Sequence, residues 1–545
     1  MKTMTMPKLL VGLATLVAGF ALFAGGPVAA DSPDEIIKRA QPSLTATDPG
    51  RRAAGVEVMA EADNKKAAEL ILKCVLAEKD AVAGYRMANA IAKLKSDEAV
   101  DEIASTVVKW TRGQDLFPAY WVLSGVAMSQ TAKGEALLKT CAVDSKSKEI
   151  YLKAAALEAV GETKRKELGY IVADVLNAFD PMWDDKGVIV LLTGVVAAER
   201  MVTRKTDKAI RDNVMLALVN ILEKTKNDRV LYFTAHALAT ITGQKLYTDA
   251  KFWRWWISIG GFEAAKDAGD GPTSAARKVP QFFEAPAVGK RVVFVIDVSG
   301  SMQWPVKMPP QPKPDPKPVV EKPKSPVTGG GSGGGDKKND KNDKEPEAMP
   351  EPDPPDYSKV KIKLDLAKVE LIYTLKQLPA DYMFNVVIYD TPSDYIDPNT
   401  KSLVPASDAN KNKFIKLVEG LKWKELTNIH GGLIDGYSIT EKGVIKGDPA
   451  WDETALQCGA ETIFFLTDGS PTYSDDSKKV DPKTQMGDGK FVNPENIVAD
   501  IKRINTFRKV VINTVGIGPH YGPLLDALAQ ITGGTYSDRT GVAPK

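Results

Sequence analysis

The sequence predicts a multidomain protein in which an all-helical region is followed by a doubly wound α/β domain. Three observations lead to this prediction. The chain has 545 residues, which is too long for one ordinary domain. Ala- and Leu-rich stretches with helical periodicity fill residues 50–260. From about residue 289 onward, short apolar runs alternate with amphipathic helical patterns. We therefore predict an export signal at 1–30, helical repeats at 31–260, a linker at 261–288 and the α/β domain at 289–541.

The first thirty residues have the pattern of a secretory signal. Lys2 and Lys8 give a positive start, an apolar stretch covers Leu9–Gly25, and small residues precede Asp31. Cleavage is expected after Ala30, which predicts an exported protein located in the periplasm or outside the cell. An uncleaved anchor is the alternative. No later segment is long and apolar enough to span a membrane.

The helical region shows a weak internal repeat. Similar segments begin at Ala88, Leu123, Ala156, Thr193 and His236, at spacings of 33 to 43 residues. This pattern resembles HEAT-type repeats, which are stacked helix pairs. An irregular helical bundle is the alternative. The aromatic run at 252–256 is expected to close the last repeat, with a ligand-stacking platform as the other possibility.

Charge and cysteine content narrow the functional classes. Residues 31–290 contain 37 Lys and Arg against 35 Asp and Glu, so no general attraction to nucleic acid or an anionic membrane is expected. The three cysteines (Cys74, Cys141 and Cys458) lie far apart and lack metal-ligand spacing. Buried free thiols are expected, and a bridge between Cys74 and Cys141 is the alternative.

The predicted elements of the α/β domain follow one another in an order typical of a parallel sheet with helices on both faces. The expected strands are Arg291–Asp297, Met383–Tyr389, Thr462–Thr467, Val510–Gly516 and Thr535–Ser537, and the expected helices are Lys361–Leu378, Asn410–Leu421, Pro494–Phe507 and Pro523–Ile531.

Oxygen-bearing side chains follow two of the predicted strands. Asp297, Ser299 and Ser301 come at the end of the first strand, and Asp468 follows the strand Thr462–Thr467. Thr427 lies between them in a turn-rich segment that leads into a helix. Ligands of open α/β sheets gather at the carboxyl ends of the strands, and hard oxygen donors suit Mg²⁺, Mn²⁺ or Ca²⁺. A helix cap, or an ion without a ligand role, is the alternative.

These residues resemble the metal-ion-dependent adhesion site of von Willebrand factor A (VWA) domains, whose fold is Rossmann-like. The resemblance rests on Asp-x-Ser-x-Ser at 297–301, the later Thr427, and Thr-Asp-Gly at 467–469, and it covers residues 289–541. It implies that the three hydroxyls bind the cation directly and that the two carboxylates act largely through water. It also implies an open position on the ion, most often Mg²⁺, that an Asp or Glu of a protein partner fills.

The chain departs from that family in one respect, because residues 303–357 intervene before the next helix. This insertion holds 14 of the chain's 35 prolines and almost no core-forming residues, so disorder is expected. It is interpreted as a tolerated spacer. The alternative is a mobile gate whose own acids reach the ion, and the candidates for those acids are Glu345, Glu347, Glu351 and Asp353.

The predicted function is that of an exported, non-enzymatic binding protein that captures an acidic group through the ion, with the helical repeats as a second interaction surface. One alternative is an RNA-binding protein resembling the Ro autoantigen, which also joins helical repeats to a VWA domain. Another is a metal-independent envelope scaffold. An enzyme is not expected, since His236, His430 and His520 show no spacing typical of a nucleophile site or a zinc site.

Overall fold

The computed structural model describes residues 31–109, 116–144, 150–178, 187–245, 247–263, 279–306 and 355–539. The predicted export signal and residues 307–354 of the predicted insertion lie outside the described residues. Within the described ranges, no helix is both long and apolar enough to cross a membrane.

The amino-terminal part of the chain is all helical, as predicted. Its α-helices are α1 (Pro33–Leu44), α2 (Pro49–Met59), α3 (Lys65–Ala77), α4 (Ala81–Ile91), α5 (Asp97–Val107), α6 (Leu116–Ser129), α7 (Ala132–Lys139), α8 (Ile150–Thr163), α9 (Gly169–Asn177), α10 (Gly187–Met201), α11 (Lys208–Lys224), α12 (Asp228–Thr242) and α13 (Ala250–Ser258).

Side-chain caps define where many of these helices begin. Ser32 forms a capping box with Glu35 at the start of α1. Asp48, Asn64 and Asp80 accept hydrogen bonds from the first-turn amides of α2, α3 and α4. Such caps satisfy amides that have no partner inside the helix, and they fix short helices in register along the chain.

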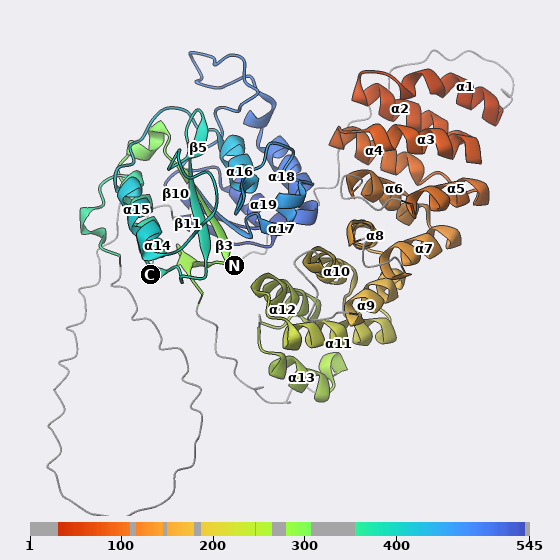
Figure 1. Ribbon diagram of the computed structural model, residues 1–545, viewed down its shortest axis with the longest axis horizontal. Coiled ribbons are helices and arrows are strands. Elements are labelled where there is room, and N and C mark those ends of the chain that lie inside the picture. The colour runs from red at the N-terminus through yellow and green to blue at the C-terminus, as the bar shows by residue number, and fades with distance from the viewer. Residues whose placement is uncertain are drawn as a thin grey trace, which may run out of the picture.

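The helices stack in two rows, which Figure 1 shows as an arc. Helices α2, α4, α6, α8, α10 and α12 contact one another in succession and form the inner row. Glycine permits their close packing, because a Cβ on Gly125 would lie 2.6 Å from the Ala88 carbonyl oxygen. A Cβ on Gly161 would likewise lie 2.9 Å from the Cα of Ala197. These contacts join α6 to α4 and α8 to α10 with almost no space between backbones.

The aromatic run at the end of the helical region is largely buried. Phe252, Trp253 and Trp256 lie in the interior, and the Trp253 indole N–H donates to the Tyr247 carbonyl oxygen at 2.9 Å. Helix α13 packs on α11, so these rings close the end of the array. Their burial supports the interpretation as a cap.

The carboxyl-terminal part of the chain forms an α/β sheet in the order β11-β10-β9-β3-β4-β5, with β6 also paired to β4. Neighbouring strands from β11 to β4 are parallel, and β5 and β6 run antiparallel to β4. The strands are β3 (Arg291–Asp297), β4 (Met383–Tyr389), β5 (Ser393–Tyr395), β6 (Val404–Pro405), β9 (Thr462–Thr467), β10 (Val511–Ile517) and β11 (Tyr536–Arg539).

Helices cover both faces of this sheet (Figure 1). Residues of α14 (Lys363–Gln377) and α15 (Asp408–Glu419) share one apolar core with one face of the sheet. Residues of α16 (Ile429–Ser438), α18 (Pro494–Arg508) and α19 (Gly522–Thr532) pack on the other face. Within β3, Val293 and Val295 face the second core, whereas Phe294 faces the first. This alternation explains the continuous apolar run, since both sides of the strand are buried.

The sequence-based bounds agree closely with this part of the structure. Strands β3, β4 and β9 have the predicted ends, and the helices α14, α15, α18 and α19 differ from prediction by a few residues. The antiparallel strands β5 and β6 have no counterpart among the predicted elements, and neither do the small strand pair β7 (Ile439–Thr440) and β8 (Gly443–Val444) or the short helix α17 (Glu453–Cys458). These elements have two to six residues, too few for a periodicity to show.

Part of the predicted linker packs into the α/β region. Strands β1 (Gln281–Phe282) and β2 (Ala285–Pro286) form a hairpin, and the side chains of Phe282 and Phe283 are buried. Phe282 contacts the rings of Phe294 and Phe464 at centroid distances of 5.6 and 5.5 Å. Residues 281–288 therefore contribute to the core of the sheet.

The inner row of helices packs directly on the α/β region. Phe117 of α6 contacts the rings of Phe507 and Trp451 at 5.3 and 5.2 Å. Glu158 of α8 pairs with Lys509 at 2.8 Å, and both side chains are buried. The apolar core of the helices is thereby continuous with the core around α16, α18 and α19.

Candidate metal site

The predicted ligands lie where the strand order of the sheet reverses. From β3 the chain continues to β4 on one side, whereas β9, β10 and β11 are added on the other side. The carboxyl ends of β3 and β9 thus flank a topological switch point, which is where open α/β sheets bind ligands. Asp297 ends β3 and Asp468 follows β9 directly.

Two of the predicted hydroxyls meet one of the predicted carboxylates. The Oγ atoms of Ser299 and Ser301 are 3.2 Å apart, and Ser301 Oγ donates to Asp468 Oδ1 at 2.7 Å. Residues 300–303 form a short 3₁₀ turn after β3. This turn brings the two serines to the same edge of the sheet as the carboxylate of the neighbouring strand.

Thr427 reaches the same place from a third segment. The amide of Gly300 donates to the Glu425 carbonyl oxygen at 2.8 Å, and the amide of Lys424 donates to the Val298 carbonyl oxygen at 2.7 Å. A Cβ on Gly469 would lie 3.8 Å from Ser301 Oγ and 3.9 Å from Thr427 Oγ1. The threonine and serine hydroxyls therefore lie within 4 Å of the same point beside Gly469, at the edge of the sheet that carries the other predicted ligands.

Asp297 is the most deeply buried member of the set. Its carboxylate accepts hydrogen bonds from the Ser299 amide at 2.8 Å and from Thr467 Oγ1 at 2.7 Å. Burial, followed by the nearby negative charge of Asp468, raises the pKa of Asp297 to about 7. Two carboxylates at close range in a buried place repel each other, and a cation would relieve that repulsion.

The site is more enclosed than the sequence indicated. Asp297, Ser299 and Asp468 are at most 1% exposed, and Ser301 is half-buried. Trp304, at 54% exposure, lies on the rim. An approaching group would therefore reach the site on the side of Ser301 and Trp304.

The donor chemistry fits a hard divalent cation. Three hydroxyls and two carboxylates would hold Mg²⁺, Mn²⁺ or Ca²⁺, whereas a soft metal would require sulfur or imidazole ligands. Among the described residues, no group of three or more His, Cys, Asp or Glu side chains could hold a metal ion. The set at β3 and β9 depends instead on its hydroxyls.

Sequence reasoning missed the residue that contacts Asp468 from the other side. Lys363, the first residue of α14, places its Nζ 2.7 Å from Asp468 Oδ2. Tyr389 of β4 also lies close, with its hydroxyl 3.4 Å from Asp297 Oδ2. Both belong to predicted elements, but only the pairing of β3 with β4 and the packing of α14 bring them to the site.

None of the three histidines contacts the predicted ligands. His430 follows Thr427 closely but points to α18, where its Nε2 lies 2.9 Å from Asp500 Oδ2. His236 pairs with Glu199 of α10 at 3.2 Å. His520 contacts the Gly518 carbonyl oxygen and the Tyr536 hydroxyl.

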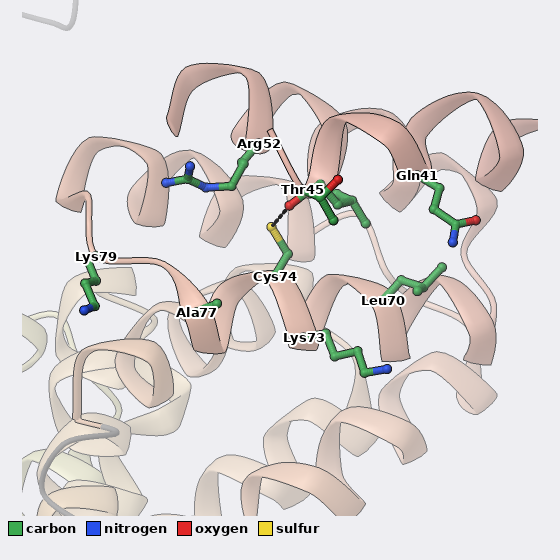
Figure 2. Close-up of a pocket in the computed structure, with 9 residues that line it drawn as sticks. Gln41, Thr45, Arg52, Leu70, Lys73, Cys74, Ala77 and Lys79 are labelled. Carbon is green, nitrogen blue, oxygen red and sulfur yellow. Dashed lines mark hydrogen bonds between the residues drawn. The ribbon is translucent and has the colours of Figure 1, made fainter. Parts of the chain in front are cut away.

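Two hollows lie away from the predicted metal site. One hollow of about 450 Å³ is lined by residues of α8, α10 and α12 and of α18 and α19. Among its charged lining residues, Glu158 is paired with both Arg200 and Lys509. The other, of about 520 Å³, lies between the first helices (Figure 2).

The hollow in Figure 2 contains a cysteine. Cys74 donates to the Leu44 carbonyl oxygen at 3.6 Å, and burial raises the pKa of its thiol to about 11. A thiol with so high a pKa stays protonated at neutral pH and is a poor nucleophile. Cys74, Cys141 and Cys458 are all buried and lie outside any disulfide, which agrees with the expectation of buried thiols.

Comparisons with known proteins give no family assignment. No family model matches the chain, and no curated protein matches it in sequence. Among solved structures, the chain is similar to a von Willebrand factor type A protein from Catenulispora acidiphila. The identity is 16%, the similarity covers 32% of this chain and 34% of that one, and the TM-score is 0.25. It is also similar to the PilB minor pilin from Streptococcus sanguinis, at 16% identity and a TM-score of 0.26, over 48% of this chain and 59% of that one.

The chain thus spans about a third of the first of these structures and less than two thirds of the second. TM-scores of this size do not carry a functional argument. The strand order of the sheet shows the doubly wound α/β fold independently of these similarities.

Proposed function

We propose that this chain is a non-enzymatic binding protein with a VWA-type domain, which uses a divalent cation to capture an acidic side chain of a protein partner. The observation that carries the proposal is the convergence of Ser299, Ser301, Thr427 and Asp468 beside the buried Asp297. Three separate segments supply this set at the switch point of the sheet. A cap for one helix would need only one of them.

The choice of donors explains how binding would work. Hydroxyls are neutral, so they hold a cation without cancelling its charge, and the carboxylates of Asp297 and Asp468 anchor it. When bound, Mg²⁺ supplies an electrophilic position that a further carboxylate can occupy. Ser301 and the exposed Trp304 define the side on which the partner's acid would enter.

We further infer that the helical region consists of HEAT-like repeats and offers a second binding surface. The support is the alternation of the inner row with an outer row, in which α3, α5 and α7 and then α9, α11 and α13 contact one another in succession. The α/β region contacts the inner row at α6, α8 and α12, so we propose the outer row as the binding surface. Because basic and acidic residues are nearly balanced at 31–290, we propose a protein partner and not nucleic acid.

We propose that the protein is exported and that residues 1–30 are removed after Ala30, on the support of the amino-terminal sequence. Sequencing the amino terminus of the protein recovered from a cell envelope or culture medium tests this placement. A mature protein that begins at Asp31 is expected. A protein found only inside the cell with an intact amino terminus would contradict it.

The function is tested by measuring metal uptake and partner capture together. Isothermal titration of the full chain with Mg²⁺ should show one site, and Asp297→Asn should remove it. In a pull-down from an envelope fraction, an acidic partner should be retained with Mg²⁺, and it should be lost with chelator or with Asp297→Asn. A partner retained equally under all three conditions would place the binding surface on the helices instead.

A further inference from the structure

A buried lysine shares one of the predicted metal ligands. Lys363 is 2% exposed, and its Nζ lies 2.7 Å from Asp468 Oδ2. The other oxygen of the same carboxylate accepts from Ser301 at 2.7 Å. Lysine is rarely buried unless paired, because an ammonium group out of water is costly without a counter-charge. The contact with Asp468 is therefore a fixed part of the site.

The space for this lysine is built by two other segments. Gly518 adopts a φ of +65°, and a Cβ at that position would lie 2.7 Å from Lys363 Cε. The ring of Trp304 covers the ammonium group, with its centroid 4.8 Å from Nζ. A side chain at 518 would collide with the lysine stem, so glycine serves both the backbone turn and the lysine.

The backbone of the lysine is fixed as well. The amide of Lys363 donates to the Trp304 carbonyl oxygen at 3.0 Å, and the amide of Val306 donates to the Lys361 carbonyl oxygen at 3.2 Å. Helix α14 thus starts directly beside the turn that carries Ser299 and Ser301. The backbone from which the lysine stem extends is thus held beside the predicted ligands.

We propose that Lys363 is an internal cation that competes with the divalent ion for Asp468 and so weakens the ion's affinity. This inference rests on the proposed function. Asp297 and Asp468 supply two carboxylates, and Lys363 offsets one of them before any ion arrives. With an ion and the lysine both present, the site holds an excess of positive charge, which favours an incoming carboxylate. Lys363 would therefore lower the affinity of the site for the ion and increase its selectivity for an acidic ligand.

The test is a titration of the full chain with Mg²⁺, and separately with Mn²⁺, in the wild type and in Lys363→Met. Methionine keeps the length of the buried stem and removes the charge. We expect Lys363→Met to bind either ion at least about tenfold more tightly, because a like charge close to the ion is gone. Lys361→Met is the matched control, since Lys361 is exposed two residues away, and its affinity should equal that of the wild type.

The outcomes separate this inference from the proposed function. If the wild type binds Mg²⁺ and Lys363→Met binds it no more tightly, the role of Lys363 is overturned and the metal site stands. If only Lys363→Met binds an ion, the competition is supported, and the proposal that the natural protein uses an ion is overturned. If neither protein binds an ion, both proposals are overturned. Should Lys363→Met fail to fold, Lys363→Gln provides the same comparison with a neutral hydrogen-bond donor facing Asp468.

Discussion

At the scale of single residues, the site is governed by the charges that are buried together. Among the described residues, Asp297 accepts hydrogen bonds from Ser299, Tyr389 and Thr467 and has no ion-pair partner, whereas Asp468 is paired with Lys363. The two carboxylates therefore differ in the role that each would have in binding an ion. Asp297 carries the uncompensated charge that would draw an ion, and Asp468 is the one whose charge is already offset.

Replacing Asp297 with Asn should have opposite effects on stability and on ion binding. The folded pKa of Asp297 is raised to about 7 from an ordinary value of 3.8. Its contribution to stability is therefore full below about pH 4 and is lost as the pH rises to about 7. Without metal, Asp297→Asn should gain stability relative to the wild type across this range. Thermal unfolding at several pH values, with and without Mg²⁺, measures both effects.

The same variant should gain no stability from Mg²⁺ at pH 8, where the wild type should be stabilised by the ion. Asp408→Asn, the same chemical change at the exposed first residue of α15, is the control. A stabilising effect of Mg²⁺ on Asp297→Asn as large as on the wild type would place the ion elsewhere.

At the scale of secondary-structure elements, the fold was largely predictable because strand ends and apolar periodicity are local properties. The runs ending at Asp297 and Thr467 defined β3 and β9 to the residue, and placing both in one parallel sheet implied that Asp297 and Asp468 lie close together. Lys363 could not be assigned, because it begins a helix that follows a long insertion. Its approach to Asp468 depends on tertiary packing, for which the sequence carries no local signal.

The ends of the predicted insertion are joined at its base. Pro305 and Ile362 form an isolated antiparallel bridge, and the amide of Lys363 donates a hydrogen bond to the Trp304 carbonyl oxygen. The two flanking segments are thus held together by contacts that do not involve residues 307–354. The ligand set should tolerate changes in that segment.

Deleting residues 308–353 and joining the ends with a short Gly-Ser linker should leave Mg²⁺ affinity unchanged within about twofold and stability nearly unchanged. Isothermal titration and thermal unfolding of the shortened chain test this. Removal of Trp304 and Pro305 as well is the comparison, and that larger deletion should weaken the site. An altered affinity in the smaller deletion would favour the alternative that the insertion acts as a gate.

At the scale of the whole molecule, a cluster of buried charged side chains joins the helical array to the α/β region. Glu158 of α8 contacts Arg200 at 2.7 Å and Lys509 at 2.8 Å, and Arg229 donates to the carbonyl oxygen of Arg508. Burial alone would raise the pKa of Glu158, but Arg200 and Lys509 outweigh it and lower the pKa to about 2. Burial also lowers the pKa of Lys509. We take Glu158 as ionised at neutral pH, because it has two cationic partners.

Replacing Glu158 with Gln should destabilise the full chain by about 3 kcal/mol at pH 7, because Lys509 would be left buried without a carboxylate. The folded pKa of Glu158 is lowered, so its contribution is present above its ordinary value of about 4.5 and is lost as the pH falls toward about 2. The difference in the free energy of unfolding between Glu158→Gln and the wild type should decrease as the pH falls over that range. Urea unfolding at several pH values measures it.

Glu162→Gln is the matched control, since Glu162 contacts Arg200 at 3.1 Å from a partly exposed position. Glu162→Gln should lower the free energy of unfolding by less than about 1 kcal/mol. Equal costs for the two substitutions would mean that the cluster does not join the two parts of the molecule. This role of Glu158 could not be predicted from the sequence, because the residue lies in an Ala-rich helix where an acidic side chain usually faces solvent.

The bridge between Pro305 and Ile362 has a practical consequence for protein engineering and for evolution. Because Pro305 and Ile362 are paired, we expect the segment between them to accept foreign sequence without a change in the described residues around it. A fluorescent protein, an epitope or a second recognition module inserted there would lie at the rim of the proposed ion site, next to any ligand bound at that site. The position is thus a candidate insertion site at which segments with new binding specificities can be added one at a time.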